Sequence, residues 1–230
     1  MKFINALIFS LLFSLNMAAV AQTMVVISSY KEYKKSVKED NKNELLNIKN
    51  VIPNILLDLK YSTSNNFTQI KLYKNAATSY LRRDAATALQ KVNLELKELG
   101  LGLKIFDAYR PYSITKLMWD LVHDERYVAN PAKGSGHNRG IAVDLTLVSL
   151  KSFAELNMGT AFDNFTDSAH HSFTKNLPPE VIANRMLLKS TMEKYGFKSL
   201  ETEWWHYSFS SKEIYDVIDI DFNILAKKIK

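Results

Sequence analysis

The sequence predicts an α+β fold: a single domain in which helices flank a small, mainly antiparallel sheet. The chain has 230 residues, of which 47% are hydrophobic, which is enough for one sizeable core and short for two. Patterns typical of helices and of short strands are mixed along the chain, without the regular strand–helix alternation of a parallel sheet. From Val51 onward neither an internal repeat nor a long low-complexity tract interrupts the sequence, so we expect the domain to span residues 51–230.

The first 22 residues carry the pattern of an export signal. Lys2 precedes a mostly apolar run over residues 3–15, and Ala19-Val20-Ala21 has the small-x-small pattern that signal peptidase cleaves. The run is too short and too interrupted for a good membrane span. We therefore expect cleavage before Gln22 and an exported product, periplasmic or secreted, without stable membrane insertion. An uncleaved amino-terminal anchor is the alternative.

Charge and composition limit the functions and the kinds of metal site that the chain can have. Residues 23–50 are polar and rich in Lys, Glu and Asn, so we expect a mobile or loosely docked lead-in there. Loss of Lys2 with the signal would lower the net charge from +6 to +5, and the basic residues are spread along the chain. The sequence has no basic stripe with interleaved aromatic residues, so nucleic-acid binding has little support. Because the chain has no cysteine, any metal site must use histidines and carboxylates.

The first half of the domain predicts two helices around a strand. Asp84 can cap a helix that runs to about Leu99, with Gly100 as its stop. Residues 103–108 then read as a strand. Ser113 can cap the second helix, whose apolar positions recur at helical spacing.

The second half predicts two strands on either side of a third helix. Residues 141–147 alternate, with Ala142, Asp144 and Thr146 opposite the apolar face. A helix starts at residues 178–179 and ends at Gly196. Residues 204–209 form the other strand.

Two histidines and one aspartate in these stretches can form a metal site. Gly140 permits a tight turn that brings His137 near the strand face of Asp144, and His206 reaches the same cleft if the two strands are neighbours. Two imidazoles and one carboxylate leave a coordination position open for water, as in catalytic zinc sites, although such ligands also suit other divalent metals. Glu203 would lie beside that position as a base, just before the strand or at a bulge, because residues 203 and 206 face opposite ways in a regular strand. Taken singly, each of these residues is more often structural.

Longer motifs resemble the zinc D,D-peptidases, the group that includes D-Ala-D-Ala carboxypeptidases, D-Ala-D-Ala dipeptidases and the hedgehog signalling domain. The pattern His137-x-x-Gly-x-Ala-x-Asp144 followed by Glu203-x-x-His206 is the paired motif of that group. Three further stretches are similar to the dipeptidase branch, whose best-known members confer vancomycin resistance, and together the motifs extend from about residue 51 to residue 209. These stretches are Tyr61-Ser62-Thr63-Ser64-Asn65-Asn66-Phe67, Asp107-Ala108-Tyr109-Arg110-Pro111 and Met158-Gly159-Thr160-Ala161-Phe162-Asp163.

The resemblance implies one zinc ion per chain in a central cleft, held by His137, Asp144 and His206. It implies that Glu203 is the catalytic base and that Arg110 stabilises the transition state. The pocket residues implied by the same comparison, which shape the site and hold the substrate's amino group, are Tyr61, Ser135 and Asp163.

The expected reaction is hydrolysis of the D-Ala-D-Ala dipeptide to two D-alanines. Asp163 would favour a free ammonium group and reject an amino end blocked by a longer peptide. Because the resistance dipeptidases act in the cytoplasm, an exported enzyme fits turnover or salvage of peptidoglycan fragments better. Two alternatives remain: a zinc D,D-carboxypeptidase acting on wall stem peptides, and a non-catalytic zinc module that binds wall peptides.

Overall fold

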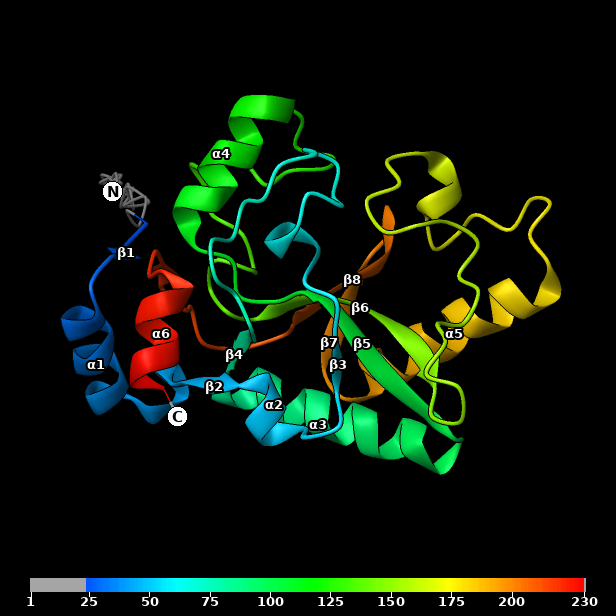
Figure 1. Cartoon of the computed structure of the whole chain (residues 1–230), viewed down its shortest axis with the longest axis horizontal. Helices are drawn as coiled ribbons and strands as arrows, with labels where there is room; N and C mark the ends of the chain where they lie inside the picture. The colour runs from blue at the N-terminus through cyan, green and yellow to red at the C-terminus, as the bar shows by residue number, and fades with distance from the viewer. Residues whose placement is uncertain (1–23, 230) are drawn as a thin grey trace, which may run out of the picture.

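A five-stranded sheet lies at the centre of the molecule, in a computed structural model that describes residues 24–229 (Figure 1). Only the pair β3–β5 is parallel, and all other neighbours are antiparallel. The α+β fold with a mainly antiparallel sheet is therefore confirmed. The strand order across the sheet is β3 (Leu56–Leu57), β5 (Leu101–Asp107), β6 (Ala142–Ser149), β8 (Glu203–Phe209) and β7 (Phe197–Leu200).

Two long helices cover one face of this sheet. Helix α3 (Arg83–Glu98) packs on β5 and on α5 (Pro179–Lys194), and its apolar stripe includes the fully buried Leu89 and Val92 (Figure 1). The alternation predicted for residues 141–147 is present, but both faces of β6 are buried. The polar residues Asp144 and Thr146 are therefore buried as well.

Two helices begin before the residues that were predicted to cap them, and those residues do not act as caps. Helix α3 begins one residue before Asp84, which lies in its first turn and does not cap it. Helix α4 (Tyr112–Val122) begins before Ser113, and Asp219 accepts hydrogen bonds from the Ser113 N–H at 2.9 Å and from its hydroxyl at 2.7 Å. The cap thus comes from a residue distant in the sequence. His123 ends α4 in the left-handed conformation (φ +48°).

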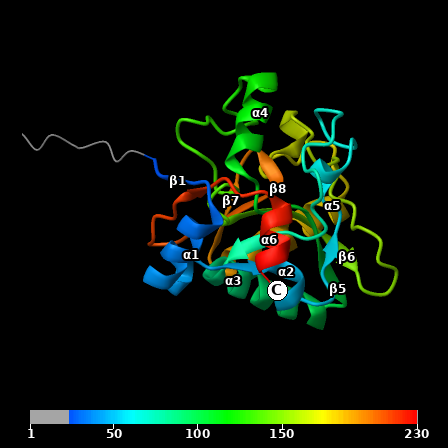
Figure 2. The ribbon, with the colours of Figure 1, turned by 60° about the vertical axis from the view of Figure 1, so that its left-hand side comes forward.

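The segment before Val51 is not loosely docked, so that prediction was wrong. Its residues pair with two other parts of the chain, and Leu45 is fully buried. Helix α1 (Tyr30–Glu39) has a capping box and lies beside α6 (Phe222–Lys228), as both views show (Figure 2). The paired strands are β1 (Val26–Ile27) with β9 (Val217–Ile218), and β2 (Leu45–Asn47) with β4 (Tyr80–Arg82); the short helices are η1 (Asn41–Asn43), α2 (Ile48–Val51), η2 (Lys60–Ser62) and η3 (Asp167–Ala169).

The predicted export signal, residues 1–22, lies outside the described residues. Within the described part of the chain, none of the helices has the length and apolar character needed to cross a membrane.

Candidate active site

Strand pairing brings two of the predicted metal ligands together. Asp144 on β6 is the direct partner of His206 on β8, and the His206 Nδ1 atom lies 2.9 Å from Asp144 Oδ1. Asp144 is buried, and its position between two imidazoles lowers the pKa of its carboxyl although burial acts in the opposite direction. The carboxylate is therefore ionised, as a metal ligand must be.

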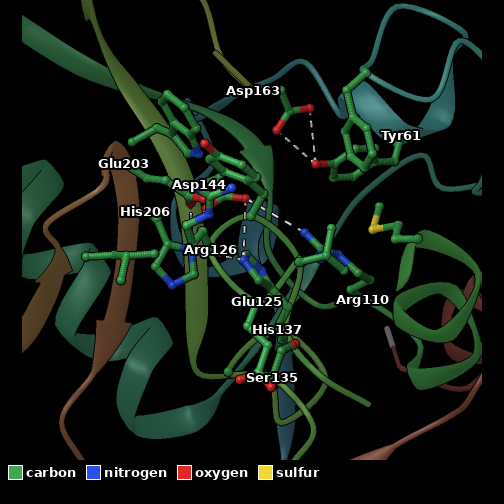
Figure 3. A pocket seen from close by; sticks show the side chains of 18 of the residues that line it. Tyr61, Arg110, Glu125, Arg126, Ser135, His137, Asp144, Asp163, Glu203 and His206 are labelled. Atoms are coloured by element: carbon green, nitrogen blue, oxygen red, sulfur yellow. Dashed lines mark hydrogen bonds and ion pairs between the residues drawn. The ribbon is translucent and has the colours of Figure 1, made fainter. Parts of the chain in front are cut away.

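The third ligand comes from the loop before β6. Gly140 has φ +71°, and an added Cβ there would meet Leu45 at 2.8 Å, so the turn after His137 needs glycine. The His137 Nδ1–H donates to the Ala108 carbonyl at 2.7 Å, which directs the other ring nitrogen, Nε2, at Asp144 and His206 (Figure 3).

The spacing of these atoms fits a tetrahedral ion. His137 Nε2 lies 3.3 Å from His206 Nδ1 and 3.4 Å from Asp144 Oδ2. Two ligands at the usual zinc–nitrogen distance are about 3.4 Å apart along the edge of a tetrahedron. The three residues form the only group of this kind among the residues that the structure describes, and they fit zinc.

Glu203 stands at the first position of β8, where the pairing with β7 is irregular. Leu200 pairs with Glu203 whereas the preceding Ser199 pairs with Tyr207. The Glu203 side chain lies near His206, at 4.0 Å between Oε2 and Nδ1, and the irregular pairing fits the expectation that Glu203 stands just before the regular strand or at a bulge. Burial raises the pKa of Glu203 to about 7, against the opposing charge of His206. A carboxyl with that pKa can accept and return a proton near neutral pH.

Arg110 follows β5 and is held by a buried carboxylate. Its Nε and Nη2 atoms donate to Asp107 Oδ2 at 2.9 and 2.8 Å, and the Tyr73 hydroxyl donates to the other Asp107 oxygen at 2.7 Å. The same guanidinium lies 3.9 Å from Asp144 Oδ2 (Figure 3). Asn138 fixes the backbone here by donating to the Arg110 carbonyl at 2.9 Å. The positive charge is therefore fixed close to the metal ligands.

Asp163 and Tyr61 lie at another side of the site. The Tyr61 hydroxyl is 3.1 and 3.2 Å from the two Asp163 oxygens and donates to this carboxyl group (Figure 3). Burial and the nearby charge of Asp144 raise the pKa of Asp163 well above its ordinary value. A cation placed against Asp163 would stabilise the ionised form of this carboxyl group. Ser135 lies in the same lining, and its hydroxyl accepts the Asn138 N–H at 3.2 Å.

All eight predicted site residues line a single cavity of about 300 Å³. A family model for D-ala-D-ala dipeptidases, in peptidase family M15, matches residues 41–223. The chain belongs to this family.

Two curated relatives and one solved structure are similar to this chain to different extents. The D-alanyl-D-alanine dipeptidase of Escherichia coli (strain K12) is 34% identical over 181 residues, which cover 78% of this chain and 92% of that protein. The D-alanyl-D-alanine dipeptidase of Enterococcus faecalis (strain ATCC 700802 / V583) is 32% identical over 184 residues, covering 72% and 91%. A structure of the LdcB LD-carboxypeptidase aligns with a TM-score of 0.40 at 21% identity, covering 69% of this chain and 75% of that one.

This member of the dipeptidase family also uses supporting residues that sequence reasoning missed. Asp107 and Tyr73 hold Arg110, and the Thr160 hydroxyl accepts the Trp204 indole N–H at 2.8 Å. Asp107 belongs to one of the stretches that resemble the dipeptidases, but the sequence does not indicate that its carboxylate binds Arg110. Arg126, in the loop after α4, lines the cavity as well.

Proposed function

We propose that this chain is a zinc-dependent dipeptidase that hydrolyses D-Ala-D-Ala to two D-alanines. One observation carries the proposal. The cavity combines the three metal ligands, a buried glutamate and a fixed arginine with a carboxyl group, Asp163, that can hold an ammonium group. The names of the curated relatives support the same substrate.

The chain's own side chains would divide the reaction between them. His137, Asp144 and His206 would hold a zinc ion, which when bound would supply Lewis acidity and lower the pKa of water to about 7. Glu203 takes a proton from the attacking water and returns it to the nitrogen of the leaving D-alanine. Arg110, fixed by Asp107, donates to the oxygen that becomes negative on the attacked carbonyl; one such donor is worth roughly 3 kcal/mol.

The amino end of the substrate separates this proposal from a carboxypeptidase. In a free dipeptide the ammonium group stands next to the first side chain, and its positive charge would pair with Asp163 and favour the ionised form of this carboxyl group, whose pKa burial raises. A longer peptide presents an uncharged amide at that point and would leave Asp163 without a cationic partner. The same site therefore favours free dipeptides over stem peptides.

A non-catalytic binding module has less support. Such a module needs neither a buried glutamate whose pKa lies near 7 nor a guanidinium fixed beside the metal ligands. Both groups are present here beside the three metal ligands, which supports the catalytic proposal.

The proposed cellular role is turnover or salvage of peptidoglycan fragments outside the cytoplasm. It rests on the export pattern of residues 1–22, with cleavage before Gln22. Amino-terminal sequencing of the protein recovered from the envelope fraction tests this point. A chain that starts at Met1 and stays in the cytoplasm would refute it.

The reaction is tested by metal removal and restoration. The protein stripped by a chelator should release no D-alanine from D-Ala-D-Ala, and one equivalent of zinc should restore release. Glu203→Ala, loaded with the same zinc content, is the control for the base. Zinc binding without hydrolysis in the wild-type protein would refute the proposal and return the binding module to consideration.

A further inference from the structure

The loop that carries Asp163 has no regular strand or long helix of its own. It leaves the sheet after β6, passes through residues 158–170 and ends at η3. Asp163 itself has φ +56°, in the left-handed region, which aspartate tolerates better than most other residues. Because most of the segment lacks regular structure, contacts with the rest of the protein are needed to keep Asp163 in place.

Arg185 on α5 meets both ends of this loop. Its Nε donates to the Met158 carbonyl at 2.7 Å, while Nη2 and Nη1 donate to the carbonyls of Ser168 at 3.0 Å and His170 at 3.1 Å. The rigid planar fork of one guanidinium thus links the two ends of the segment, and Asp163 lies between them in the sequence.

Among the residues that the structure describes, Arg185 is buried without a carboxylate partner. It is 3% exposed, and none of the ion pairs found among residues 24–229 includes it. A buried guanidinium without a carboxylate is costly unless its donors are satisfied. Here the loop carbonyls accept three hydrogen bonds from its N–H groups, so the position of the charge and that of the loop depend on each other.

Two other contacts hold the same loop. Gly159 has φ +83°, and a Cβ there would lie 2.7 Å from Val181 on α5, so the loop backbone is pressed against that helix. Thr160 accepts the indole N–H of Trp204, the residue after Glu203. Thr160 therefore connects the loop that carries Asp163 to β8, the strand that carries Glu203.

We propose that Arg185 is a positioning residue for substrate recognition: by binding the carbonyls of Met158, Ser168 and His170 it holds Asp163 at the place where the substrate's ammonium group binds. This inference rests on the proposed dipeptidase function. Arg185 does not line the cavity and acts only through the loop. Loss of Arg185 should therefore affect substrate binding more than the chemical step.

A double-mutant cycle tests this role. Arg185→Met, Asp163→Ala and the double variant are compared with the wild type for KM and kcat on D-Ala-D-Ala. We expect Arg185→Met to raise KM about tenfold with kcat changed about twofold or less, and to have almost no further effect on KM when Asp163 is already alanine. Equal effects of Arg185→Met in both backgrounds would overturn the inference.

Arg82 provides a matched control. It is also fully buried and donates to three backbone carbonyls, those of Asn43, Arg139 and Asp216, away from the Asp163 loop. Arg82→Met should lower the thermal midpoint as Arg185→Met does, but its effect on KM should be additive with Asp163→Ala. Non-additivity of the control as well would show that the cycle reports general destabilisation, and would overturn the inference.

Two further measurements keep the test decisive. If Arg185→Met does not fold, Arg185→Lys enters the same cycle, since it keeps the charge but cannot bind three carbonyls. Hydrogen exchange of the amides of residues 158–170 should speed up in either variant while the sheet amides stay unchanged. A wild-type protein inactive on D-Ala-D-Ala would refute the proposed function, and the exchange result would still decide whether Arg185 holds the loop: unchanged exchange there overturns the inference.

Discussion

Replacing Arg110 by methionine should separate its structural role from its catalytic one. In the folded protein Arg110 neutralises Asp107, with N–O distances of 2.8 and 2.9 Å, and both side chains are buried. Arg110→Met removes one partner of this pair and leaves a buried carboxylate with only the Tyr73 hydroxyl. The companion variant Asp107→Asn/Arg110→Met removes both charges.

The expected loss of stability depends on whether the Asp107 carboxylate is still present, whereas the expected loss of activity does not. Breaking a buried pair from one side costs about 3–5 kcal/mol of unfolding free energy, whereas removing both partners is much less costly. We expect the lower end of that range, because burial raises the pKa of Asp107 and the lone carboxyl can take up a proton. Loss of an oxyanion donor should lower kcat by about 10²–10³-fold in both variants, since neither has the guanidinium.

The assay combines urea unfolding with initial rates of D-Ala-D-Ala hydrolysis at matched zinc content. The double variant should recover at least half of the stability lost in Arg110→Met and none of the activity. If activity returns together with stability, Arg110 is a structural partner of Asp107 and its catalytic assignment is refuted.

Three further predictions concern residues around the site. Asp163→Asn should raise KM for D-Ala-D-Ala about 30-fold, because an ion pair of roughly 4 kcal/mol at an effective dielectric constant of 20 is about halved by desolvation; steady-state kinetics measure this, and an unchanged KM contradicts it. Burial lowers the pKa of His171 to about 4, so the unfolded chain binds that proton more readily and stability falls as the pH drops from about 6.5 toward 4. Between pH 7 and pH 5, the variant His171→Gln should lose about 1 kcal/mol less stability than the wild type, a value that allows for the partial exposure of His171. Equal losses in both proteins would show that His171 is not responsible. Gly159→Ala should destabilise the fold by about 2 kcal/mol or more, seen as a lower urea midpoint, because φ is positive and the new methyl group meets Val181; an unchanged midpoint would show that the loop can shift there.

The parts of the site that local sequence could predict are those set by strand parity and turns. Alternation placed Asp144 and His206 on a shared face, and Gly140 allowed the turn that returns His137 to it. Parity also required an irregularity between Glu203 and His206, and the pairing of β7 with β8 has one. These features depend on a few neighbouring residues, so a single sequence contains them.

The features that escaped prediction depend on residues far apart in the chain. Asp219 caps α4 across more than a hundred residues of sequence, so Ser113 looked like the cap. Arg185 binds carbonyls, which every residue possesses, and its partners leave no trace in the sequence. Helix α1 buries little more than Tyr33 among its lysines, so its composition resembled that of an undocked segment.

The most direct test of the central claim compares free D-Ala-D-Ala with amino-acetylated D-Ala-D-Ala, using zinc-loaded protein and Glu203→Gln as the control. The account predicts release of D-alanine from the free dipeptide only, with the rate lowered by about 10²-fold or more in Glu203→Gln. Equal or faster cleavage of the acetylated substrate would contradict the role of Asp163 and assign the enzyme to carboxypeptidases. An unchanged rate in Glu203→Gln would contradict the mechanism.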